Sequence, residues 1–169
     1  MSSHQFNRPR LASALLFCWA LAAEASPTTP HVIFEPVPAV ERRAASEAAE
    51  LVRFARAELG IRLDWSDASV VQIERLAVAL GKDLRREGSR LSEVDKLVRL
   101  LGSYVGEVYR RNHGGRWGEA ELGGQRRVAL QPDRGQGLIW PIERIRLCLR
   151  RGGGSGLAAY DGQRLLAQP

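Results

Sequence analysis

A chain of 169 residues with a formal net charge of +6 is long enough for one domain and basic enough to favour anionic partners. Its two cysteines exclude a disulfide-rich scaffold, and they cannot form an internal disulfide if Cys18 is removed with the N-terminus. The three histidines show no ligand spacing, so we predict no metal site and no cofactor.

Residues 1–25 have the features of a cleavable signal peptide. Arg8 and Arg10 form a basic region, an apolar run covers 11–22, and Ala23-Glu24-Ala25 fits the small-x-small cleavage pattern. The apolar run is shorter than the roughly 20 residues that a spanning helix needs. We therefore predict cleavage near Ala25, a periplasmic or secreted protein and no transmembrane span afterwards. An uncleaved membrane anchor and a mis-assigned start codon are the alternatives.

Residues 26–38 form a proline-rich lead-in, in which Val32 to Phe34 could make a short edge strand. A single domain is predicted over 39–151. Apolar residues at helical spacing predict helices over 39–59 and from about 64 to 80, with Gly60 and Gly81 as stops. Ser66 has the side chain expected of an N-cap. A third helix is predicted from 92 to about 113, ended by Gly114 and Gly115.

The apolar period then changes from that of a helix to that of a strand. Short runs over 117–122, 126–130 and 138–140 are separated by glycine-rich turns, which predicts a three-stranded antiparallel meander. Pro141 suits the start of a helix whose inner face includes Cys148, which we predict to be buried, with pairing between chains as the alternative. Residues 152–169 read as a flexible tail with a weak helix.

The predicted fold class is α+β. N-terminal helices pack against a small three-stranded antiparallel sheet, and a C-terminal helix follows.

Two glycines, Gly102 and Gly106, interrupt the third predicted helix and lie on one line of it with His113. A glycine inside a helix costs about 1 kcal/mol relative to alanine. Close packing of another element against bare backbone is the simplest compensation. The alternative is a ligand groove with His113 at its rim.

Glu107 is the carboxylate of this stretch that invites a functional interpretation. The favoured interpretation is a surface ion pair with Arg111, one turn further along the helix. A partly buried anchor for the turn that ends at Trp117 is a second interpretation. A general base acting with His113 is a third, and it would make the protein a hydrolase, although no recognisable catalytic motif supports it.

The second half of the chain is strongly basic. Residues 110–151 contain ten arginines and four acidic residues. A nucleic-acid or polyanion binder is therefore a further alternative, and solvated basic surface is the plain interpretation. Trp117 and Trp140 are expected in the core, with base stacking as the less favoured role. The arginines that would bind are Arg110, Arg111, Arg116, Arg126 and Arg127.

The segment from Leu63 to about Tyr160 resembles an uncharacterised bacterial domain family. The resemblance is carried by Asp64-Trp65-Ser66, by the Gly102-Ser103-Tyr104-Val105-Gly106-Glu107 run, by the 111–117 segment ending in Gly114-Gly115-Arg116-Trp117, and by Trp140-Pro141-Ile142. It implies an α+β fold with Gly102, Tyr104, Gly106, Gly114, Gly115 and Trp117 as structural motif residues. It implies no activity.

The leading functional prediction is a small exported binding or interaction module without catalysis of its own. Its partner would be an envelope protein or an anionic polymer.

Overall fold

The structure is a computed structural model that describes residues 32–87, 91–122, 124–135 and 137–151. The predicted signal peptide and C-terminal tail lie outside these residues. Strand β1 (Ile33–Pro36) is followed by helices α1 (Pro38–Glu58), α2 (Asp67–Glu87) and α3 (Leu91–His113). Strands β2 (Arg116–Leu122) and β3 (Gln125–Gln131) and helix α4 (Pro141–Arg151) complete the order. The α+β prediction is confirmed.

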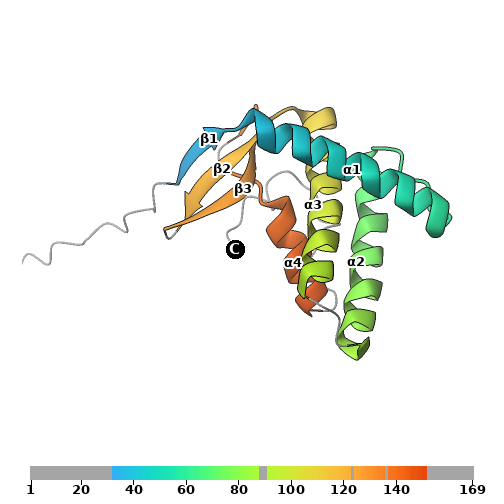
Figure 1. Cartoon of the computed structure of the whole chain (residues 1–169). Helices are drawn as coiled ribbons and strands as arrows, with labels where there is room; N and C mark the ends of the chain where they lie inside the picture. The colour runs from blue at the N-terminus through green and yellow to red at the C-terminus, as the bar shows by residue number, and fades with distance from the viewer. Residues whose placement is uncertain (1–31, 88–90, 123, 136, 152–169) are drawn as a thin grey trace, which may run out of the picture.

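Helix α3 is the centre of the helical layer. Helices α1, α2 and α4 all pack against it, and α1 crosses it near its C-terminal half (Figure 1). The sheet lies at one end of this layer, where β2 contacts α1 and β3 contacts α4. The main core is formed between the helices, from residues such as Leu51, Ile73, Leu101 and Ile145, none of which is exposed.

The sheet has the order β1-β2-β3, and both pairs are antiparallel. The predicted third strand over 138–140 is wrong, because this segment makes only a single bridge between Leu130 and Ile139. The third strand is β1 instead, which comes from the predicted lead-in. Its register pairs Phe34 with Ala120, and the N–H of Val37 donates to the carbonyl of Trp117 as α1 begins.

Helix boundaries follow the apolar period except in α2. The predicted stop at Gly81 is wrong, since α2 continues to Glu87. Gly81 lies inside the helix because the backbone of α4 packs against it: a Cβ there would lie 2.6 Å from the carbonyl oxygen of Leu149. At the end of α3 the prediction holds, because Gly114 has a φ of 80° and its N–H donates to the carbonyl of Arg110.

Candidate functional site

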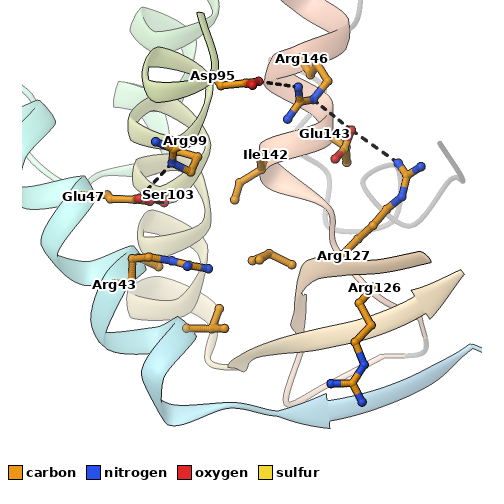
Figure 2. Close-up of a pocket in the computed structure, with 13 residues that line it drawn as sticks. Arg43, Glu47, Asp95, Arg99, Ser103, Arg126, Arg127, Ile142, Glu143 and Arg146 are labelled. Atoms are coloured by element: carbon orange, nitrogen blue, oxygen red, sulfur yellow. Dashed lines mark hydrogen bonds and ion pairs between the residues drawn. The ribbon is translucent and has the colours of Figure 1, made fainter. Parts of the chain in front are cut away.

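A pocket of about 270 Å³ lies between α1, α3, α4 and β3 (Figure 2). Side chains from four elements that are distant in sequence line it. They are Val40, Arg43, Ala44, Glu47, Asp95, Arg99, Ser103, Arg126, Arg127, Val128, Ile142, Glu143 and Arg146. Between these elements, β2 contacts α1 and β3 contacts α4, and the pocket lies beside these contacts.

The acidic side chains of this pocket form hydrogen bonds or ion pairs with other side chains of the protein. The hydroxyl of Ser103, which has no exposed surface, donates to Oε2 of Glu47 at 2.7 Å. Arg99 Nε lies 3.4 Å from the other oxygen of Glu47. Arg146 bonds Asp95 at 2.8 Å and lies 3.4 Å from Glu143 (Figure 2).

The pocket lining carries an excess of positive charge. Five arginines and three carboxylates line it, a formal balance of +2. Arg127 lies 3.7 Å from Glu143, close to the limit of an ion pair, and Arg126 pairs with Glu119 on the neighbouring strand. Within the described part of the chain, exposed Arg43 makes no ion pair. Among the lining arginines, Arg43 of α1 is therefore the one without a carboxylate partner, and Arg127 of β3 has only a long contact.

Gly102 and Gly106 lie where helix α3 meets other elements at close range. A Cβ at Gly102 would lie 2.6 Å from the Cα of Ile142 in α4. At Gly106 it would overlap the indole ring of Trp117. Both neighbours are protein atoms, so these glycines permit packing, which agrees with the close-packing interpretation.

Glu107 is buried, which corrects the interpretation of a surface ion pair. Its side chain has no exposed surface, and Trp117 Nε1 donates to its Oε1 at 2.8 Å. Arg110 donates to both carboxylate oxygens, at 2.8 and 3.1 Å, and Arg111 Nε lies 3.4 Å from Oε2. The pairing with Arg111 exists, but it is the longest contact of the set.

The electrostatics of this cluster hold Glu107 in its charged form. Burial alone would raise the pKa of Glu107, but hydrogen bonds from Arg110 and Trp117 and the charges of Arg110 and Arg111 outweigh it. The net effect lowers the pKa below the usual glutamate range. A general base needs a pKa near the working pH and access to a substrate proton, and Glu107 has neither feature. The carboxylate instead joins β2 to α3.

The ion pair of His113 is made with a residue of α2, and not with the residues that bond Glu107. The Nε2 of His113 is 3.1 Å from a carboxylate oxygen of Asp67 at the start of α2, and its ring centre lies 4.9 Å from that of Tyr109, with the two planes tilted. The bonds of Glu107 lead instead to Trp117, Arg110 and Arg111. The structure therefore does not place Glu107 and His113 around a common substrate position, which the hydrolase hypothesis requires.

The loop before α2 contains a residue, Trp65, whose strained backbone was not predicted from the sequence. Trp65 has a φ of 64°, in the left-handed region that non-glycine residues rarely adopt. The hydroxyl of Tyr104 accepts its N–H at 3.1 Å, and Asn112 donates to its carbonyl at 3.1 Å. The guanidinium of Arg111 lies 3.6 Å from the centre of its ring. These contacts hold the loop between α1 and α2 in place.

The five arginines proposed as binders are not all available in the structure. Arg110 is held by Glu107 and by Glu41, and Arg111 by Glu107 and the ring of Trp65. Exposed Arg116 lies on β2, outside the pocket. From the predicted set, only Arg126 and Arg127 line the pocket. Trp117 and Trp140 are buried, as expected for core residues.

Sequence reasoning missed the arginines that the helices contribute to the pocket. Arg43 precedes Glu47 by one turn on α1, and Asp95, Arg99 and Ser103 follow each other by single turns on α3. Residues four apart lie on one face of a helix, so these polar lines were available as a signal. Helix packing decides that these two lines of polar residues, one on α1 and one on α3, face each other across a hollow.

Other classes of site are not indicated among the described residues. No cluster of three or more His, Cys, Asp or Glu side chains could hold a metal ion there. No disulfide joins residues of this part, and Cys148 is buried. A membrane-spanning helix is likewise not found among the described helices, none of which is both long and apolar enough.

Comparison with known proteins adds information on the fold only. No family model and no curated protein matches the chain. A crystal structure of a protein from Bacteroides thetaiotaomicron VPI-5482 matches with a TM-score of 0.52 at 14% sequence identity. The match covers 76% of this chain and 45% of that protein, so the chain corresponds to less than half of it. At this identity the likeness shows a shared fold and nothing further.

Proposed function

We propose that the protein is a small exported binding module that holds an anionic ligand in the pocket between α1, α3, α4 and β3. The observation that carries the proposal is the charge of the lining, in which five arginines meet three carboxylates that already have protein partners. Guanidinium groups suit carboxylate and phosphate ligands because their paired N–H donors match two oxygens at once.

Export rests on the order of features in residues 1–25, where a basic region precedes an apolar run and an Ala-x-Ala site. Intact-mass measurement of the protein from the producing cell tests it. We expect a chain that begins near residue 26 and is recovered outside the cytoplasm. A full-length cytoplasmic product would contradict export and leave the pocket proposal standing.

Anion binding is tested by calorimetric titration of the purified protein with acetate and with inorganic phosphate. Low ionic strength is required because the arginines are partly exposed and salt screens them. Arg43→Gln and Arg127→Gln should each weaken binding by about tenfold, since a hydrogen bond to a charged group contributes about 1.5 kcal/mol at the low end of its range. Arg53→Gln is the matched control, an exposed arginine of α1 outside the pocket lining.

Unchanged binding in both pocket variants would contradict the proposed site. A second titration, with polyphosphate as the probe, distinguishes the polyanion alternative from the pocket proposal. A polyanion surface should use exposed Arg116 and lose affinity steeply as salt rises, because many counterions are released. The pocket hypothesis expects a shallow salt dependence and no effect of Arg116→Gln.

A further inference from the structure

Strand β1 gives the sheet an open edge. It is the outermost strand, paired with β2 on one side and followed by α1 (Figure 1). Its Ile33 is 68% exposed, the largest fraction among the exposed large apolar side chains of the described residues. An edge strand that exposes an apolar side chain is a template for pairing with a further strand.

The hydrogen bond from the N–H of Val37 to the carbonyl of Trp117 shows which backbone groups of β1 face this edge. Every second residue of an antiparallel strand bonds the same neighbour, so the odd-numbered residues of β1 bond β2, as Val37 does. The even-numbered residues Val32 and Phe34 therefore direct their N–H and C=O groups outward. No described residue bonds these groups.

The same edge of a second copy of the chain complements these groups. In an antiparallel pairing centred on Ile33, Val32 of each copy lies opposite Phe34 of the other, and each donates one bond and accepts one. Ile33 then faces Ile33 of the second copy in a non-hydrogen-bonded pair, where opposite side chains are closest. Pro36 lies outside this ladder, so its missing N–H leaves no bond unmade.

The charge of Glu35 favours this register over its neighbours. A pairing centred on Glu35 would set two like charges opposite each other, which destabilises a strand pair, and would put Pro36 opposite Phe34. A pairing centred on Phe34 would set Ile33 against the carboxylate of Glu35. In the pairing centred on Ile33, the two Glu35 residues lie about 14 Å apart along the strands. Each keeps its ion pair with Arg126 at 3.5 Å.

The opposite edge of the sheet, at β3, is less open. Ile139 already exchanges two backbone hydrogen bonds with Leu130 of β3. Closer to the start of the same strand, Arg127 lies 3.7 Å from Glu143 of α4. The edge that is free to pair along its length is therefore that of β1.

We infer that the protein forms a symmetric dimer in which the β1 strands of two copies pair antiparallel about Ile33. The pairing joins the two three-stranded sheets into one and uses the same edge on both copies, as a two-fold interface requires. It lies apart from the anion pocket, so it does not depend on the proposed function. An interface of this length is small, and the dimer should therefore form between micromolar and millimolar protein.

Cysteine substitutions in the full chain test the register. A Cys18→Ser background leaves Cys148, which is buried, as the remaining thiol. In this background Ile33→Cys should give a disulfide-linked dimer on mild oxidation, since the Cα atoms of a non-hydrogen-bonded pair lie about 4.5 Å apart, within disulfide reach. Glu35→Cys is the matched control, on the same face and 65% exposed, but too far from its copy to be bridged. Intact mass without reductant reads out both variants.

Sedimentation equilibrium over the same concentrations measures the association itself. Ile33→Lys should raise the dissociation constant of the dimer by about tenfold or more, because two apolar side chains are lost and two like charges meet. Phe54→Lys is the control, at an exposed apolar residue of α1, and should dimerise as the wild type does.

Three results would overturn the inference. One is a protein that stays monomeric up to millimolar concentration, or whose Ile33→Cys and Glu35→Cys variants cross-link equally. Another is a dimer that Ile33→Lys leaves intact, which would place the interface elsewhere. The third is an assembly larger than a dimer, which would indicate head-to-tail pairing of β1 with β3.

Discussion

Replacing Glu107 by glutamine tests whether the buried carboxylate holds β2 on α3. The substitution preserves shape and removes the charge. It also turns an amide NH2 group toward donors, because Arg110 and Arg111 offer only N–H groups to this site. One amide oxygen remains for the indole N–H of Trp117. The same oxygen can keep the bond from Arg110 Nε, so the bonds that are lost are those that Arg110 Nη2 and Arg111 Nε donate to Oε2.

The magnitude follows from the burial of the three partners. Removing one member of a buried ion pair costs about 3–5 kcal/mol when the remaining charge stays buried. Here the Arg110 and Arg111 side chains are 29% and 39% exposed, so water can solvate them after the change. We expect Glu107→Gln to lower the free energy of unfolding by about 2–3 kcal/mol.

Urea denaturation followed by circular dichroism measures this effect. For a domain of this size the expected loss moves the unfolding midpoint by about 1–2 M. Glu121→Gln, at an exposed glutamate of β2, is the control and should stay within about 0.5 kcal/mol of the wild type. A Glu107→Gln protein that is as stable as this control would refute the reasoning, and would return Glu107 to the role of a surface residue.

Three further predictions concern the same junction and the strained loop. Because the pKa of folded Glu107 lies below its usual value of 4.5, its stabilisation should be present above that pH and disappear as pH falls through the folded pKa, so the stability gap to Glu107→Gln should close in acid melts. Gly106→Leu should lose more than about 3 kcal/mol in urea titration, since its side chain overlaps a Trp117 ring held in place by Glu107; an unchanged midpoint would contradict this packing. Trp65→Ala should lose about 2 kcal/mol in the same assay, because Tyr104 and the guanidinium stacked on the ring lose their contact; an equally stable variant would contradict the role of these contacts.

The helical part of the fold could be predicted from the sequence because its signal is local. Apolar residues at helical spacing placed α1 and α3 to within about one residue of their ends. The hydroxyl of Ser66 accepts the N–H of Ser69 as an N-cap should, and Gly114 ends α3 in the left-handed conformation. Each of these features depends on residues within one or two turns of each other.

The tertiary structure decided what depends on contacts between distant segments. The third strand is β1, from the lead-in, and not the segment over 138–140. The backbone of β1 pairs with that of β2, some eighty residues away in the sequence. Gly81 continues a helix because α4 packs on it, although glycine by itself favours a stop. The sequence allowed a short edge strand at Val32 to Phe34, but its pairing with β2 and the continuation of α2 through Gly81 depend on distant contacts.

The same division applies to the site. The sequence by itself determined that Glu107 and its two arginines share one helix, and that charged residues follow single turns on α1 and α3. It did not determine which of these side chains would be buried. Burial of Glu107 was decided when Trp117 docked on Gly106, and the arginine-lined pocket arose where α1, α4 and β3 meet around α3. Spacing sets which side chains share a face, but only the packing of elements decides whether that face meets protein or solvent.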